Sequence, residues 1–361
     1  MLLLIAAPVV MLACLVLYLW LAFRWLRNQT RGDRYFARPI AERRELKSQI
    51  ARRARVIVPI VTALSRVIPT PSFDRKFRGV AFNPIICPRR SFEAATRYRP
   101  EPGDIFIATQ MKCGTTWMQQ VVYELLSRGN GDLSDSGHRH MYALSPWIES
   151  SASVSMQAAP RIGSTGKRII KTHFPAALCP WAEDARYIYV ARHPVSCFAS
   201  CMDFIRFLGG PMAPSAQKFL ETYCSDDMWW QSWPDHVAGW WDWSIDRHNV
   251  LFVHYEDMLS DLGAQVDRVA AFLDTTLAPD ETSEVIRKSR FAHMKEHEES
   301  FEMSAPGYFS MADGSFFASG RADRDQDVGP PERERIIAYC RKQLAGSRYP
   351  LGRFYPDVVG G

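Results

Sequence analysis

The sequence predicts an α/β fold of three layers, in which a central, mostly parallel sheet is flanked by helices, together with one N-terminal transmembrane helix. Two patterns indicate this fold: short apolar runs alternate with longer helical segments after residue 100, and an uncharged stretch opens the chain. With 361 residues, 47% of them hydrophobic, the chain is long enough for one large core or for a domain of roughly 250 residues with appendages.

Four short apolar runs are typical of buried strands: Asp104–Ala108, Arg168–Lys171, Tyr187–Ala191 and Val250–His254. Helices are expected after them at Thr115–Leu126, Pro194–Phe204, Gly263–Leu273 and Pro331–Leu344. Because the strands are apolar almost throughout, the sheet should be parallel and covered on both faces. In such sheets ligands bind outside the carboxyl ends of the strands, and unusual polar residues gather at those ends here.

The eight cysteines are scattered, with no CxxC pair. Neither they nor the nine histidines show a spacing that we interpret as a zinc site. We therefore expect reduced, mostly buried thiols and no metal.

The segment 1–23 carries no charged side chain and is long enough to cross a bilayer, which takes ~20 apolar residues. A cleaved signal peptide is the alternative, but a basic leader is absent and the apolar stretch is too long for one. Basic residues follow directly, at Arg24, Arg27, Arg31 and Arg34. By the positive-inside rule we expect a single-pass membrane protein whose remaining chain lies in the cytoplasm.

The segment 24–100 holds 19 of the Lys and Arg residues against five Asp and Glu. Basic residues alternate there with apolar patches at 56–61 and 63–68, a composition that suits contact with anionic lipid headgroups. A solvated basic linker explains the composition equally well. Aromatic residues are too sparse for a nucleic-acid stacking surface, so we expect no nucleic-acid partner. We divide the chain into an anchor at 1–23, a juxtamembrane segment at 24–100 and a domain at 101–361.

The first motif, at residues 112–117, reads Lys-Cys-Gly-Thr-Thr-Trp and lies between the first strand and its helix. Gly114 permits a tight turn, and Thr115 and Thr116 present hydroxyl and N–H groups at a helix N-terminus, which favours a phosphate. Lys112 adds a cation. The motif resembles a P-loop without its GxxxxGK[ST] pattern, and an ordinary capped helix is the plainer interpretation of the hexapeptide alone.

Two further motifs follow the next two strands. Lys171 and His173 lie at the end of the second, where a histidine beside a phosphate loop is a candidate base. Arg192 lies at the end of the third and Ser200 eight residues later, in the following helix. An arginine at a strand end can hold a phosphate with two hydrogen bonds, although a salt-bridged arginine is the commoner case.

In order and spacing, these motifs resemble the sulfotransferases of cytosolic type, which use 3′-phosphoadenosine 5′-phosphosulfate (PAPS). That family has KSGTTW at the first motif, where Cys113 here replaces Ser, and KTH at the second. Further similarity lies at 145–149 (SPWIE), 236–241 (HVAGWW), 250–258 (VLFVHYEDM) and 289–295 (SRFAHMK). The resemblance runs from about Asp104 to beyond Phe317 and implies a P-loop-like fold.

The resemblance also implies roles. His173 would be the general base, Lys112 would stabilise the bridging oxygen, and Lys171 would support the transferring sulfonate. The loop 112–117 would bind PAPS, with Thr115 and Thr116 at the 5′-phosphate and Trp117 stacked on adenine. Arg192 and Ser200 would hold the 3′-phosphate. No metal is required.

One family motif is missing. The family completes its 3′-phosphate site with Arg-Lys-Gly and a later Trp, whereas alignment on Gly320 puts Ala318 and Ser319 at the basic positions. Arg321 and Arg324 are the candidate replacements, and we select Arg321. The family's dimer motif is also degraded, so the sequence does not determine the oligomeric state.

The acceptor half is less defined. Aromatic residues are dense between 203 and 243, and Gly209, Gly210 and Pro211 indicate a flexible loop of the kind that caps a pocket. With an anchor alongside, we expect a small-molecule or lipid acceptor, an apolar hydroxyl or amine. The alternatives are a membrane-anchored PAP-binding protein without transfer activity, and a P-loop kinase or NTPase, which would need a Walker lysine that the chain lacks.

Overall fold

Four parallel strands form the central sheet of this computed structural model, which describes residues 2–66, 76–84, 86–302, 306–310, 320–321 and 323–359. They are β3 (Asp104–Ala108), β4 (Arg168–Thr172), β5 (Arg186–Ala191) and β6 (Val250–His254), in the spatial order β4-β3-β5-β6. All four predicted strands are confirmed, with β4 one residue longer and β5 one residue earlier than expected. Since Ala108 pairs with both Thr172 and Tyr189, three strands end at one edge.

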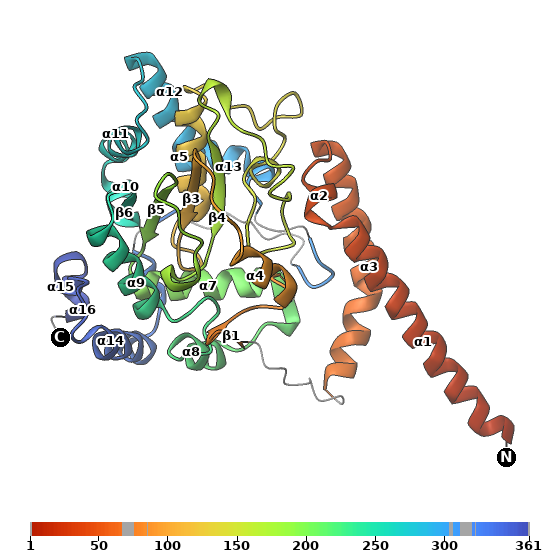
Figure 1. Cartoon of the computed structure of the whole chain (residues 1–361). Helices are drawn as coiled ribbons and strands as arrows, with labels where there is room; N and C mark the ends of the chain where they lie inside the picture. Colours follow the sequence, from red (N-terminus) through yellow and green to blue (C-terminus); the bar gives the residue numbers. More distant parts are fainter. Residues whose placement is uncertain are drawn as a thin grey trace.

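Two groups of helices cover the sheet, which confirms the predicted three-layer α/β fold (Figure 1). In one group the helices α5 (Thr115–Leu126), α11 (Leu262–Phe272) and α12 (Pro279–Ser289) pack against one another. The other consists of α7 (Pro194–Gly209), α9 (Trp233–Asp246) and α14 (Pro330–Leu344). The sequence analysis did not predict α9 or α12.

The remaining elements are short, apart from two N-terminal helices. The helices are α1 (Leu2–Gln29), α2 (Gly32–Tyr35), α3 (Ile40–Ser65), α4 (Arg89–Ala95), α6 (Met141–Leu144), α8 (Ala216–Tyr223), α10 (Tyr255–Ser260), α13 (Phe291–Glu296), α15 (Leu351–Phe354) and α16 (Pro356–Val359). A small hairpin pairs β1 (Lys76–Phe77) with β2 (Val80–Ala81). The 3₁₀ turns are η1 (Gly163–Thr165), η2 (Ala176–Leu178), η3 (Gly210–Met212), η4 (Glu298–Ser300) and η5 (Arg324–Asp327).

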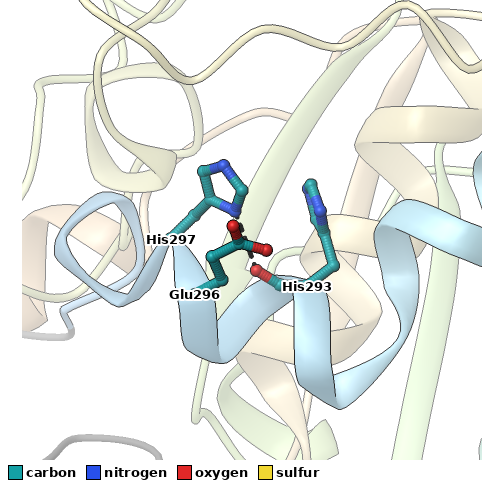
Figure 2. Close-up of side chains that lie close together, drawn as sticks. All are labelled: His293, Glu296 and His297. Carbon is teal, nitrogen blue, oxygen red and sulfur yellow. Dashed lines mark hydrogen bonds between the residues drawn. The ribbon is translucent and has the colours of Figure 1, made fainter.

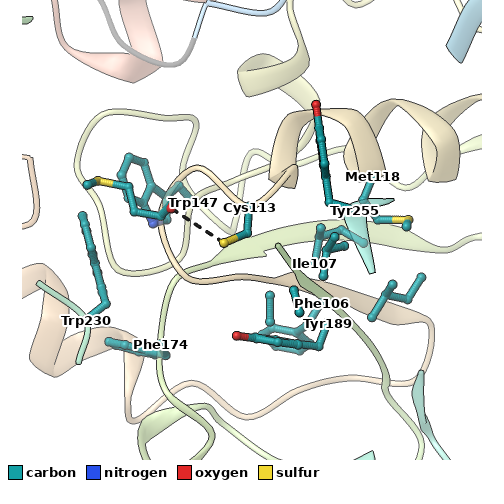
Figure 3. Close-up of a cluster of buried hydrophobic side chains, with 14 of the residues drawn as sticks. Phe106, Ile107, Cys113, Met118, Trp147, Phe174, Tyr189, Trp230 and Tyr255 are labelled. Carbon is teal, nitrogen blue, oxygen red and sulfur yellow. Dashed lines mark hydrogen bonds between the residues drawn. The ribbon is translucent and has the colours of Figure 1, made fainter. Parts of the chain in front are cut away.

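The core follows from the apolar strands, since every residue of β3 and of β4 is buried. Figure 3 shows Phe106 and Ile107 of β3 beside Met118 of α5 and Tyr189 of β5. On the other side Tyr189 stacks on Trp240 of α9, with ring centroids 5.4 Å apart. The helices thus remove both faces of the sheet from water, which explains why the strands carry no polar alternation.

At its N-terminus the chain forms a long helix, α1, that projects from the domain (Figure 1). Its stretch Pro8–Gln29 contains an 18-residue window with a mean hydropathy of 2.1 and is long and apolar enough to cross a membrane. The segment 24–100 is largely helical and contributes to the domain's core, where Tyr35, Phe36 and Phe92 are fully buried. The apolar patch predicted at 63–68 falls partly outside the described residues.

At the opposite edge of the sheet, a buried ion pair joins the first residues of β3 and β4. Arg168 donates to Asp104 at 2.8 and 2.9 Å, and the Asp104 side chain is fully buried. Removal of one partner from such a pair leaves an uncompensated buried charge.

We therefore expect Arg168→Ala to lower the free energy of unfolding by about 3–5 kcal/mol. The control is Arg161→Ala, which removes the exposed pair with Glu101 and should cost about 1 kcal/mol or less. Urea unfolding monitored by circular dichroism measures both. Equal losses in the two variants would contradict the argument.

Candidate active site

Three loops meet where β3, β5 and β4 end, and they carry the residues that the motifs selected. The loop 109–114 follows β3, His173 follows β4, and Arg192 follows β5. The chain passes from β3 to β4 on one side and then to β5 on the other, so the order of strands reverses around β3. Such a reversal is where open parallel sheets bind their ligands.

The loop before α5 has an unusual backbone. Lys112 and Gly114 both have positive φ angles, 66° and 103°, and α5 begins at Thr115 immediately afterwards. A Cβ atom added to Gly114 would lie 2.8 Å from the Tyr255 ring. Gly114 is thus required both by its backbone angle and by the close approach of Tyr255.

Cys113 lies beneath this loop and has no exposed surface. Its Sγ lies 3.6 Å from the Sγ of Cys197 on α7, which is 4.0 Å from the Sγ of Cys201. Figure 3 shows the Cys113 side chain among buried apolar residues. Cys113 therefore cannot offer its thiol to a ligand, and its backbone N–H donates to the Gln110 carbonyl at 3.3 Å.

His173 is almost fully buried and held on several sides. Its Nδ1 donates to the carbonyl oxygen of Thr109 at 2.8 Å, so the lone pair lies on Nε2. That Nε2 is buried and has no partner in the described part of the chain. Its ring lies between Trp147 and Trp230, each 5.1 Å away. Burial, followed by the charge on Lys171, lowers the pKa of His173 well below its usual value, so the ring is neutral at pH 7.

Glu149 fixes the backbone around His173. It accepts hydrogen bonds from the His173 backbone N–H at 2.6 Å and from the Thr172 hydroxyl at 3.1 Å. The segment that carries it pairs with β4, because Trp147 forms an isolated bridge with Lys171. Sequence reasoning noted the SPWIE similarity but assigned Glu149 no role, and its position within that similarity was the available signal.

Two lysines lie next to this imidazole, the fully buried Lys171 and the partly buried Lys112. Lys171 Nζ donates to the Tyr142 hydroxyl at 2.8 Å and lies 3.7 Å from the Trp147 ring centroid. Burial lowers its pKa to about 7, although the Glu149 carboxylate opposes that shift. Lys112 Nζ lies 4.8 Å from the Phe204 ring centroid, and burial lowers its pKa to about 8. Both ammonium groups are poorly hydrated, and a bound anion would relieve that cost.

Thr115 connects the loop to His173 through a chain of hydroxyl groups. Its Oγ1 lies 2.6 Å from the Thr109 Oγ1, which lies 3.2 Å from His173 Nδ1. Thr116, the next residue of α5, is also buried. Trp117 is half-buried, donates to the Ser289 carbonyl at 2.7 Å, and meets the Tyr255 ring edge-on.

Arg192 lies across the face of Tyr255, with its guanidinium carbon 4.4 Å from the ring centroid. It donates to the carbonyls of Lys112 and Arg321 at 3.3 and 3.1 Å. Its Nε is buried and has no partner among the described residues. Within the described part of the chain the arginine is held by carbonyl oxygens and by no carboxylate, so its charge is available to an anion.

Of the two candidate replacements for the missing basic motif, Arg324 is the buried one. It pairs with Asp203 of α7 at 2.6 Å and with Asp327 at 3.0 Å. Arg321 is exposed by half and pairs with Asp327 at 2.9 Å. Ser200 lies on α7 three residues before Asp203, in a helix that packs against η5. Ala318 and Ser319 lie outside the described residues.

A different cluster of possible metal ligands lies on α13 and just after it, where His293, Glu296 and His297 come together (Figure 2). Their ligand atoms lie within 4.8 Å of one another, and His297 Nδ1 contacts the His293 carbonyl at 2.9 Å. The sequence analysis overlooked this pair of histidines four residues apart. Burial, followed by the neighbouring His297, lowers the pKa of His293, and the positive charges of Arg287 and Lys288 add to that shift and oppose a cation there.

Comparison with known proteins agrees with this geometry. Residues 102–348 match the family model described as a sulfotransferase domain. Sulfotransferase 1C2 of Rattus norvegicus is 29% identical over 235 residues, which are 63% of this chain and 78% of the relative. Sulfotransferase 1C2 of Homo sapiens is 30% identical over 217 residues, 58% of this chain and 69% of the relative.

Solved structures show the same fold. A mouse sulfotransferase complexed with PAP has a TM-score of 0.58 at 22% identity, with 79% of this chain and 98% of that chain covered. Retinol dehydratase in a complex with retinol and PAP has a TM-score of 0.58 at 20% identity, covering 73% and 88%. The chain belongs to the sulfotransferase domain family, and its enzyme class is that of the PAPS-dependent sulfotransferases.

The backbone at Gly114 gives a testable expectation. In Gly114→Ala the new Cβ would have to tolerate a φ of +103° and would also lie against Tyr255. In Gly79→Ala only the unfavourable φ of +81° would be tested, because the space around the new Cβ is open. We expect Gly79→Ala to lower the free energy of unfolding by roughly 1–2 kcal/mol, and Gly114→Ala to lower it further and to weaken PAP binding. Urea unfolding and calorimetric titration with PAP measure these effects. Unchanged PAP affinity in Gly114→Ala would contradict the phosphate-loop assignment.

Proposed function

We propose that this enzyme transfers the sulfuryl group of PAPS to a hydroxyl or amine of an apolar acceptor, by in-line displacement with His173 as general base. One observation carries the proposal: a neutral, buried imidazole, whose Nε2 has no partner among the described residues, lies beside the ammonium groups of the buried Lys171 and the partly buried Lys112. An acceptor needs a base, and a sulfuryl donor needs positive charge at its leaving oxygen.

His173 has the tautomer that a base requires. Because the Thr109 carbonyl receives the Nδ1 proton, the Nε2 lone pair can accept the acceptor's proton. The resulting imidazolium would remain hydrogen-bonded to Thr109, and Glu149 would hold the adjacent backbone. This arrangement supports a role for Thr109 and Glu149 as positioning residues.

Lys112 and Lys171 supply the charge in this proposal. Lys112 belongs to the loop at the end of β3 and would neutralise the bridging oxygen that leaves with the phosphate. Lys171, held by Tyr142 and Trp147, would support the sulfonate. Since both cations come from the protein, the proposed reaction needs no metal ion.

The nucleotide would lie along the strand ends. Thr115 and Thr116, at the N-terminus of α5, would receive the 5′-phosphate, and the half-buried Trp117 would stack on adenine. Arg192 and Ser200 would hold the 3′-phosphate. Burial and the contact with α7 favour Arg324 over Arg321 as the third basic group of that site.

The acceptor is proposed from the location of the chain and from the names of its relatives. The helix α1 is able to anchor the enzyme in a membrane, with its basic flank and the domain on the cytoplasmic side. The curated relatives include a 3-alpha-hydroxysteroid sulfotransferase of Cavia porcellus, and one structural neighbour holds retinol. Both printed names refer to apolar molecules with a hydroxyl group, which supports an acceptor of that kind.

One prediction of the proposed function concerns the base. We expect His173→Ala to lower kcat by at least about 100-fold, because a positioned base contributes that much, and to leave PAP affinity within threefold by calorimetric titration, a limit of about 0.6 kcal/mol. His248→Ala, at an exposed histidine, is the matched control and should keep full activity. A His173→Ala enzyme with most of its activity would remove His173 from the base role, and a wild-type enzyme that binds PAP without transfer would favour the non-catalytic alternative.

The second prediction concerns pH. The pKa of His173 is well below 6.5, so the neutral base persists above that pH, whereas Lys171 loses its charge as the pH rises through about 7. We expect kcat/KM to fall on the alkaline side of neutrality, and kcat to fall at higher pH because bound PAPS favours the charged lysine. Lys171→Arg should move the alkaline limb upward. A kcat/KM that rises steadily from pH 7 to about 9 would contradict a cationic Lys171.

The third prediction separates the two arginines. We expect Arg324→Ala to weaken PAP binding at least about tenfold, since a charged hydrogen bond is worth ~1.5–3 kcal/mol, while Arg321→Ala changes it little. Neither variant should alter binding of adenosine 5′-phosphosulfate, which lacks the 3′-phosphate. Asp203→Ala, which frees Arg324 from its partner, should keep or improve PAP affinity. A loss in Arg321→Ala alone would reverse the assignment.

A further inference from the structure

We infer that the second half of α3 is a re-entrant membrane element, which enters one leaflet beside α1 and takes the η3 edge of the domain into that leaflet. The acceptor would then reach the active site from the bilayer. The inference about the acceptor rests on the proposed function, whereas the membrane contact of α3 stands independently of it.

The exposure of α1 supplies the first step. Its apolar side chains from Val9 to Phe23 are widely exposed, with Met11 at 72% and Val16 at 59%. Less exposed positions recur every three or four residues, at Leu15, Leu19, Ala22, Leu26 and Gln29. One stripe of α1 thus packs on protein, while the rest of its surface is apolar and bare, as expected for a helix that contacts lipid.

The contact between α1 and α3 sets their relative height. Figure 1 shows α3 running back past α1 in the opposite direction. The guanidinium carbon of Arg53 lies 3.9 Å from the Trp25 ring centroid, so these two residues lie at the same level. The Tyr308 hydroxyl donates to the Ala22 carbonyl at 2.8 Å, which fixes α1 to the domain just below that level.

At this level both helices change from segments with charged residues to segments without them. On the N-terminal side of Arg24, α1 has no charged residue. On the C-terminal side of Arg55, α3 has none before Arg66. The exposed Arg24, Arg27, Arg52, Arg53 and Arg55 therefore form a belt above two uncharged segments. Arginines at one height with apolar helix below are what a headgroup region and its hydrocarbon require.

The length of the α3 segment shows how far it reaches. The run Val56–Ser65 has ten residues, or about 15 Å of helix, which is half of the ~30 Å hydrocarbon core. Such a segment cannot cross a bilayer. The chain returns to the domain, where Lys76 of β1 pairs with Asp227 at 2.7 Å. Val56, 53% exposed, is the largest bare apolar side chain of this run.

The end of α3 meets the domain at its acceptor side. The hydroxyls of Thr62 and Ser65 lie 3.9 and 3.7 Å from the sulfur of Met212 in η3. Because η3 continues from α7, and Phe204 of α7 contacts Lys112, the contact with α3 is linked through α7 to a cation of the active site. An apolar hydroxyl or amine compound dissolved in that leaflet could enter the domain there without leaving the membrane.

Spin labelling tests the position of α3. Full-length enzyme with Cys14→Ser and Cys224→Ser would be reconstituted in phosphatidylcholine–phosphatidylglycerol vesicles and labelled at Ala63→Cys or at Arg52→Cys. We expect the nitroxide at 63 to be relaxed more by oxygen than by a water-soluble nickel chelate, and the nitroxide at 52 to show the reverse. Preferential relaxation of both labels by the nickel chelate would overturn the inference.

Activity tests the route of the acceptor. We expect Ala63→Lys to lower kcat/KM for hexadecanol in phosphatidylcholine vesicles at least about tenfold, because a charge resists hydrocarbon. Turnover of soluble 4-nitrophenol should stay within twofold, a difference of about 0.4 kcal/mol. Equal turnover of hexadecanol in both enzymes would refute entry from the bilayer. Transfer to neither acceptor by the unmodified enzyme would refute the proposed function and leave the spin-label result standing.

Discussion

Parallel hydrogen bonding of β3 to both β4 and β5 is the constraint on which the active site depends. The register that pairs Ala108 with Thr172 and with Tyr189 places three loops at one edge, although they are separated by up to 80 residues in the chain. The buried Asp104–Arg168 pair secures the opposite edge. Since the middle of each strand is apolar, the charged side chains of the sheet lie at or near the strand ends, where they can act on a ligand.

Burial gives these polar groups their chemistry. A lysine or histidine in water would be charged or half-charged at neutral pH, but removal from water lowers the pKa of Lys112, Lys171 and His173 together. These cations are electrostatically costly, and the aromatic rings of Phe204 and Trp147 and the Tyr142 hydroxyl lie against them. An anion such as a phosphosulfate would remove that cost, which connects the fold's core to the proposed specificity for PAPS.

Much of this was predictable from sequence, because strands buried on both faces and a Gly114 turn leave clear local signals. Contacts between distant segments were not. The thiols of Cys113 and Cys197 meet beneath the loop, Thr109 sets the tautomer of His173, and Arg324 pairs with Asp203, yet none of these pairs has a local pattern. Likewise α3 was not predicted as a helix, because its basic residues and Pro59 obscured its periodicity. Site roles carried over by family resemblance stay predictions.

The central claim is that this cluster of cations and one neutral imidazole transfers a sulfuryl group to an apolar acceptor. Incubation of the purified full-length enzyme with radiolabelled PAPS and a membrane lipid extract tests it most directly. The account predicts enzyme-dependent label in the organic phase, absent with His173→Ala and unaffected by excess ATP. Binding of PAP without labelled product from any acceptor, lipid or soluble phenol, would contradict it.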